Sequence, residues 1–155
     1  MLPLPDEDLK VADIDGDGNL DVISANVAAF GFAVMYGDGQ GNFGPPQPTV
    51  GPIGLCAVAV GDFTGRGRMD VAALPYLPST AMVFRNNGDR TFTFVEQHTV
   101  GLGPQGVQAA RLDNDRHDDL ISMSMLSESV AVLRNRNRSR SPGNRIGETP
   151  RTCSP

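Results

Sequence analysis

The stretch DIDGDGNLD, residues 13–21, carries aspartates at its first, third, fifth and ninth positions. Four like charges on one short loop repel one another, and each carboxylate loses water as the loop folds. A bound cation would offset both costs, and carboxylate and carbonyl oxygens are the ligands that Ca²⁺ prefers. The other interpretation is a turn without an ion, because Asp and Gly both suit turns.

The stretch belongs to a repeat with a period of 49 residues. Asp21, Asp70 and Asp119 each end a polar loop and open an apolar segment; the three loops read DIDGDGNLD, DFTGRGRMD and RLDNDRHDD. The turns GDGQGNF and NNGDRTF end at Phe43 and Phe92, again 49 residues apart. A period of this length indicates a repeat architecture in which neighbouring units stack.

The segments between these loops have the character of strands. They are four to eight residues long with a period of two, and the Asp-Gly and Asn-Gly pairs suit tight hairpins. We therefore predict an all-β fold of β-propeller-type blades, each a four-stranded antiparallel meander. Closed propellers have about four to eight blades, so about three units predict an open or partial propeller.

The repeat sets the expected boundaries. The segment GPPQPTVGP, residues 44–52, is expected to connect two blades. The last segment is rich in arginine and poor in apolar residues, which is typical of disorder. We expect a lead-in at residues 1–10, blades at 11–49 and 50–99, a partial third blade at 100–134, and a disordered basic tail at 135–155.

Two segment pairs resemble the FG-GAP or VCBS repeat family, which includes integrin α-subunit propellers and large secreted bacterial proteins. They are VADIDGDGNLDVISAN with MYGDGQGNF, and VAVGDFTGRGRMDVAAL with VFRNNGDRTF. The resemblance covers roughly residues 11–134. It implies a β-propeller, an extracellular or cell-surface location, and a calcium ion in the hairpin between the first two strands of a blade.

The main candidate metal site is the first loop. Asp13, Asp15 and Asp17 can turn three carboxylates toward one point, Gly18 permits the sharp turn, and Asn19 offers its backbone carbonyl. Asp21 is the closing acid, as the resemblance implies. A helix–loop–helix calcium site would need Glu at the twelfth position, which is Ser24. Magnesium suits the loop less because it keeps its waters, so the expected cofactor is Ca²⁺ with a structural role.

The other two loops depart from this pattern and are weaker candidates. The second offers Asp62, Thr64 and Asp70, with Arg66 at the fifth position. The third offers Asp113, Asp115 and Asp119, with Arg111 first and Arg116 in place of the turn glycine. In both loops an arginine is an alternative, built-in cation.

No catalytic motif accompanies the two histidines, His98 and His117. The expected function is a non-catalytic module for adhesion or recognition of a protein or carbohydrate. The alternatives are the propeller portion of a secreted hydrolase or lyase, and a structural repeat fragment without its own activity. A cleft with a perturbed acid and a convergent nucleophile would favour the enzyme.

The net charge and the hydropathy of the sequence indicate which classes of partner the chain is expected to bind. Residues 1–133 carry a net charge of −10, which disfavours nucleic acid, and the arginines of 134–155 are the one basic segment. No apolar run has the length of a membrane span. The first ten residues, MLPLPDEDLK, lack the apolar region of a signal peptide. Open blade faces predict self-association.

Overall fold

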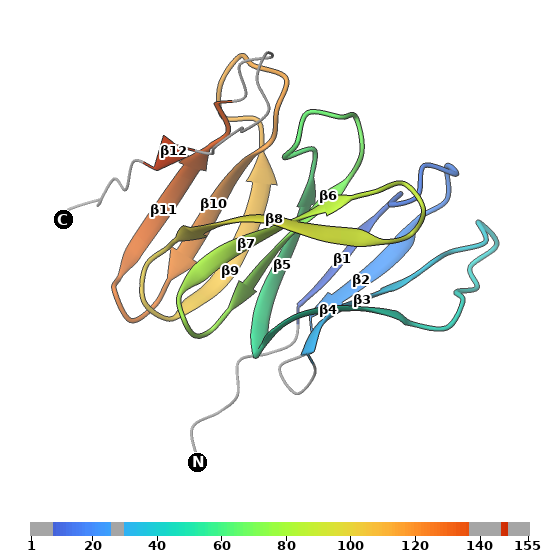
Figure 1. Cartoon of the computed structure of the whole chain (residues 1–155), viewed down its shortest axis with the longest axis horizontal. Coiled ribbons are helices and arrows are strands. Elements are labelled where there is room, and N and C mark those ends of the chain that lie inside the picture. The colour runs from blue at the N-terminus through green and yellow to red at the C-terminus, as the bar shows by residue number, and fades with distance from the viewer. Residues whose placement is uncertain (1–7, 26–29, 137–146, 149–155) are drawn as a thin grey trace.

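The computed structural model describes residues 8–25, 30–136 and 147–148, and these residues form strands and turns without a helix. Three four-stranded antiparallel sheets follow one another along the chain, which confirms the predicted all-β, blade-like architecture (Figure 1). The sheets form an open arc. No helix among the described residues is long and apolar enough to cross a membrane.

Each sheet is a meander in which the strands keep their sequence order. Blade 1 consists of β1 (Leu9–Ala12), β2 (Asp21–Ala25), β3 (Phe30–Met35) and β4 (Gln47–Ile53). Blade 2 consists of β5 (Leu55–Gly61), β6 (Asp70–Pro75), β7 (Thr80–Asn86) and β8 (Phe92–Thr99). Blade 3 consists of β9 (Pro104–Ala110), β10 (Asp119–Ser124), β11 (Ser129–Arg134) and β12 (Gly147–Glu148).

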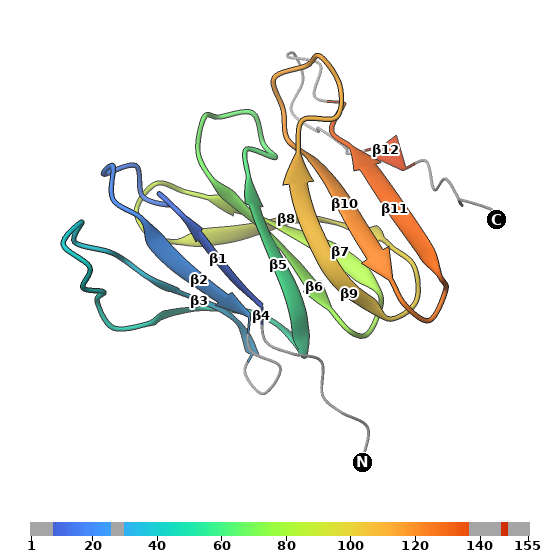
Figure 2. The same ribbon diagram turned by 180° about the vertical axis from the view of Figure 1, so that it is seen from behind.

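The blades pack face to face, with β5 beside both β1 and β9 (Figure 2). Two apolar clusters fill the two junctions. At the first junction the Phe32 ring meets Phe84 and Phe92 edge to face, with centroids 5.3 and 5.2 Å apart. The second junction is filled by smaller side chains, among them Ala72, Leu74 and Leu120. The core of the molecule therefore lies between the sheets.

The proline-rich segment differs from its expected role as a connection. Residues 47–53 form β4, the outermost strand of blade 1, and Pro48 pairs with Ala33 of β3. Proline lacks an N–H to donate, so an edge strand is the place in a sheet where it is tolerated. The boundary expected after residue 49 falls within this strand, and only Gly54 separates β4 from β5.

Blade 3 also extends beyond its expected end at residue 134. Asn135 is buried, and Gly147 and Glu148 pair with β11 to add a fourth strand. The described strands of blade 3 therefore include residues that we assigned to a disordered tail. Most of that tail, residues 137–146 and 149–155, lies outside the described residues.

Candidate metal centre and blade junction

The loop between β1 and β2 folds around its own acidic side chains. The Asp13 carboxylate accepts hydrogen bonds from the backbone N–H groups of Gly16 and Gly18, at 2.8 and 3.0 Å. Asp15 accepts from the N–H of Asp17 at 3.1 Å. Gly18 has φ +88°, a backbone conformation that glycine adopts without a steric cost. These contacts turn the loop back on itself.

Three of the five predicted ligands come together in this loop. Asp13, Asp15 and Asp21 each place a carboxylate oxygen within 4.8 Å of the others, although Asp15 and Asp21 come from different ends of the loop. Asp17 lies outside this group and accepts from the N–H of Asn19 at 2.8 Å. The Asn19 side chain lies against Gly39, in the turn after β3.

Asp21 has a second role, which holds the hairpin together. It is fully buried, and one oxygen accepts from the N–H of Ile14 at 2.8 Å. Its other oxygen accepts from the N–H of Gly37, just after β3, at 2.9 Å. A carboxylate that accepts backbone N–H groups in this way offsets part of its desolvation cost.

The same arrangement recurs in the other blades. Asp70 accepts from the N–H groups of Thr64 and Asn86, and Asp119 accepts from those of Leu112 and Asn135. Burial raises the pKa of the Asp70 carboxyl, although the hydrogen bonds from Asn86 and Thr64 oppose this. Asp21, Asp70 and Asp119 therefore have the same structural role in the three blades, and this role does not depend on an ion.

A cation from the next blade contacts the first loop. Arg90 lies in the turn between β7 and β8, and its Nε and Nη2 atoms are 2.9 and 2.7 Å from Oδ2 of Asp15. The hydrogen bond to Asp15 raises the pKa of the Arg90 guanidinium. The same group lies over the Tyr36 ring, 4.3 Å from its centroid. Asp15 thus links blade 1 to blade 2.

This arginine differs from the ones that the sequence suggested. We considered Arg66, Arg111 and Arg116 as built-in cations of their own loops. Within the described residues, Arg66 makes no ion pair, and Arg111 pairs with Asp118 at 3.4 Å. Arg90, which contacts the first loop, is 75 residues from Asp15 in the sequence. No feature of a single repeat unit indicates that contact.

The second and third loops close without a common carboxylate focus. Asp62 accepts from the N–H groups of Arg66 and Gly67, while the Thr64 hydroxyl donates to Asp70 at 2.8 Å. In the third loop the Asp113 carboxylate accepts from the backbone N–H of Asp115. The Asp115 carboxylate in turn accepts from the backbone N–H of His117. Within the described chain, three acids converge as a candidate metal site only in the loop of blade 1.

Two asparagines that we did not single out join the blades. The Asn86 side-chain amide donates to the carbonyl of Ile14 at 2.7 Å. Asn135 donates to the carbonyl of Phe63, also at 2.7 Å. Asn86 and Asn135 are 49 residues apart and occupy equivalent positions at the end of the third strand of their blades. The repeat spacing was therefore the signal that would have found them.

A hollow with mixed lining lies beside this junction. Its volume is about 410 Å³, and it is bordered by β3, β4 and the start of β8. Tyr36 and Arg90 meet at its wall, together with Gln47, Thr49 and Thr91. Burial raises the pKa of the Tyr36 phenol above its ordinary value of 10.0. The hollow combines an aromatic ring, a cation and neutral hydrogen-bonding groups.

Comparison with known proteins places the repeat in a family. A family model described as an FG-GAP-like repeat matches residues 13–73 and 62–122. No curated protein matches the sequence. A solved structure of a lectin from Agrocybe aegerita is similar in fold, with a TM-score of 0.54 and 23% sequence identity. That lectin specifically recognises non-reducing terminal N-acetylglucosamine. The match covers 84% of this chain but only 35% of the lectin.

Proposed function

Because the chain belongs to the FG-GAP-like repeat family, we propose that it is a calcium-binding recognition module without catalytic activity, at the cell surface or outside the cell. The family is generally non-catalytic and typically extracellular. The observation that carries the calcium proposal is the convergence of Asp13, Asp15 and Asp21 on one point. We propose one ion per chain.

The residues of the first loop fit a calcium ion. Ca²⁺ holds its oxygen ligands at 2.3–2.6 Å, so two ligands lie at most about 5 Å apart. The mutual separation of the three carboxylate oxygens, within 4.8 Å, meets this condition. A carboxylate has about four lone-pair sites, so Asp13 and Asp21 keep capacity beyond the N–H groups they accept. Asp17 and the Asn19 carbonyl are the candidates for the remaining ligands.

A bound calcium ion would add positive charge to the first loop, in which Asp15 is paired with Arg90. Arg90 neutralises part of the charge at Asp15. Calcium and Arg90 therefore compete for Asp15, which lowers the affinity for the ion. We expect a dissociation constant on the order of 10⁻⁴ to 10⁻³ M, as in extracellular calcium modules. Occupancy of such a site depends on the calcium concentration, and the bound ion stabilises the hairpin.

We propose a carbohydrate as the recognised ligand, in preference to a protein. The hollow at the first junction has the size and the mixed lining of a small-molecule site. Amides, hydroxyls and a guanidinium can hydrogen-bond to sugar hydroxyls, and the Tyr36 side chain adds apolar surface. Recognition of N-acetylglucosamine by the structurally similar lectin supports this ligand class.

Thermal unfolding with and without calcium tests the stabilising ion. We expect calcium to raise the melting temperature of chelator-treated protein. Asp15→Asn should abolish this rise, whereas Asp113→Asn, at the same position of the third loop, should keep it. Both side chains accept one N–H two residues ahead, so Asp113→Asn controls for that loop contact. Asp15→Asn also weakens the pair with Arg90, so the calcium-induced rise is compared with each variant's own calcium-free melting temperature. An equal rise in wild type and Asp15→Asn would contradict the site.

A glycan array tests the ligand class. We expect binding to a sugar-terminated probe and its loss in Thr49→Ala or Gln47→Ala, because both side chains line the hollow. Thr99→Ala in β8 serves as the control, since it lies outside the hollow. Protein that responds to calcium but binds no glycan would overturn the carbohydrate assignment and leave the metal site intact.

A further inference from the structure

We propose that a second copy of this chain covers the open face of blade 3 with its own blade 1, in a head-to-tail arrangement. The proposal rests on the repeat geometry and is independent of the calcium and carbohydrate assignments. We call the face of a blade toward the next blade its leading face, and the opposite face its trailing face. Each internal junction joins a leading face to a trailing face.

Blade 2 shows how a leading face is normally covered. Leu74 and Ala81 lie on this face and are both 0% exposed under blade 3. The same positions of blade 3, 49 residues later, are Met123 and Val130. They are paired across β10 and β11 and therefore lie side by side. Met123 is 55% exposed and Val130 is 41% exposed.

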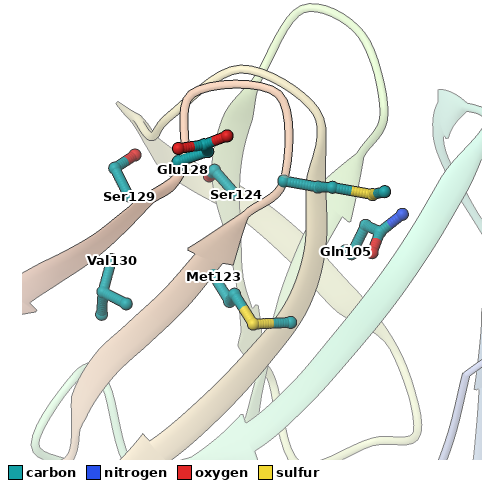
Figure 3. Close-up of a pocket in the computed structure, with 7 residues that line it drawn as sticks. Gln105, Met123, Ser124, Glu128, Ser129 and Val130 are labelled. Carbon is teal, nitrogen blue, oxygen red and sulfur yellow. The ribbon is translucent and has the colours of Figure 1, made fainter.

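The open leading face of blade 3 is apolar and hollowed. A pocket of about 290 Å³ is lined by residues that include Gln105, Met123, Met125 and Val130. Figure 3 shows Gln105, Met123 and Val130 at this pocket. Gln105 corresponds to Cys56 of blade 2, which is buried in the second junction. Leu112 extends the exposed face, whereas Ile14 and Phe63 at its repeat positions are buried. The leading faces of blades 1 and 2 are therefore covered by the next blade, whereas the leading face of blade 3 is exposed.

Blade 1 offers the complementary surface. Val58 and Val107, on the trailing faces of blades 2 and 3, are both buried. The corresponding residue of blade 1 is Leu9, which is 55% exposed, and Val11 beside it is also exposed. Each chain therefore carries one uncovered leading face and one uncovered trailing face, in the register that packs at the internal junctions.

This complementarity favours a second copy as the occupant. The contact is heterologous, because different surfaces of the two copies meet, and repeated contacts either close into a ring or continue as a filament. Two copies would bring together six blades, which is within the range of closed propellers. At each internal junction an asparagine side chain, Asn86 or Asn135, donates a hydrogen bond to the preceding blade. The contact between two copies would lack this hydrogen bond, because Gly37 of blade 1 occupies the position of the two asparagines. We therefore expect association that depends on concentration.

Sedimentation velocity over a concentration series tests the proposal. Wild-type chain should sediment increasingly as an oligomer as its concentration rises. Met123→Glu blocks the leading face and Val11→Glu blocks the trailing face, so each variant alone should stay monomeric. Both replaced side chains are exposed, and circular dichroism checks that the variants fold. Val95→Glu, an exposed position in β8 of blade 2, lies on neither of the two open blade faces and should associate like the wild type.

Mixing the two blocked variants distinguishes head-to-tail from symmetric contact. The intact leading face of Val11→Glu can bind the intact trailing face of Met123→Glu, so the mixture should form a one-to-one dimer. Oligomers of Val11→Glu alone would overturn the proposal, because they indicate contact between two leading faces. A wild-type chain that stays monomeric at its highest soluble concentration would also overturn it and would leave the face to a different partner.

Discussion

The side-chain amide of Asn86 donates a 2.7 Å hydrogen bond to the main-chain carbonyl of Ile14, in the candidate metal loop of the preceding blade. Asn86 is buried, and its own backbone N–H donates to Asp70. One residue therefore joins the buried aspartate of blade 2 to the acidic loop of blade 1. The position of that loop depends on the blade junction as well as on its own turn.

We predict that Asn86→Ala lowers the free energy of unfolding by about 1–3 kcal/mol, because the buried Ile14 carbonyl loses its partner. Asn135→Ala should have a similar effect at the second junction, since Asn135 donates to Phe63 in the same way. Urea unfolding measures both. Asn87→Ala, whose hydrogen bonds are exposed within one turn, is the matched control and should cost less. Equal losses in all three variants would argue against a special role for the junction.

We predict that Arg90→Ala strengthens calcium binding. Arg90 contacts Asp15 directly, so its removal takes away a competing positive charge. The expected gain is a severalfold lower dissociation constant at most, because solvent and salt screen an exposed charge. Calorimetric titration measures it. Arg68→Ala is the control, because Arg68 donates to the Asn87 carbonyl and to no acid of the first loop. Weaker binding in Arg90→Ala would show that the arginine assists the ion.

We predict that stability falls above pH 9 through the Cys56 thiol. Burial raises the pKa of this thiol from its ordinary value of 9.0 to about 11. The unfolded chain therefore loses this proton first, so the stabilising contribution is complete below pH 9 and is lost between pH 9 and pH 11. The slope from this group is at most about 1.4 kcal/mol per pH unit. Urea unfolding at several pH values measures it, and Cys56→Ala should have a shallower slope. Identical slopes would contradict the assignment.

We predict that Gly31→Ala is far more destabilising than Gly41→Ala. Both glycines have a positive φ, +100° and +92°, so both replacements strain the backbone. A Cβ on Gly31 would also clash with the Thr49 carbonyl of β4, whereas none of the described atoms lies within 4 Å of a Cβ on Gly41. The difference between the melting temperatures of the two variants measures the effect of the clash with β4. Similar melting temperatures would indicate that β4 moves away without cost.

The sequence predicted the fold well because the information was local and repeated. The 49-residue period and the turn residues were sufficient for antiparallel blades and for the position of the hairpin loops. The strand at residues 47–53 was missed because its prolines oppose strand formation, and only its place at the sheet edge tolerates them. The pairing of Gly147 with Arg134 was missed because no pattern in the intervening sequence indicates it.

The candidate site was predicted less completely. Acidic spacing identified Asp13, Asp15 and Asp21, whose oxygens converge in the structure. It did not indicate that Asp21 closes the hairpin through backbone N–H groups, since that role depends on Gly37 in the turn after β3. Nor did it indicate Arg90, because contact with Asp15 requires knowledge of how the second blade packs on the first.

Calorimetric titration of calcium into chelator-treated protein tests the metal site most directly. The account predicts one ion per chain in wild type and in Asp113→Asn, and no binding heat in Asp15→Asn. A stoichiometry near three would place ions in all the repeat loops. No heat in wild type, or equal heat in Asp15→Asn, would contradict a calcium ion held between Asp13, Asp15 and Asp21.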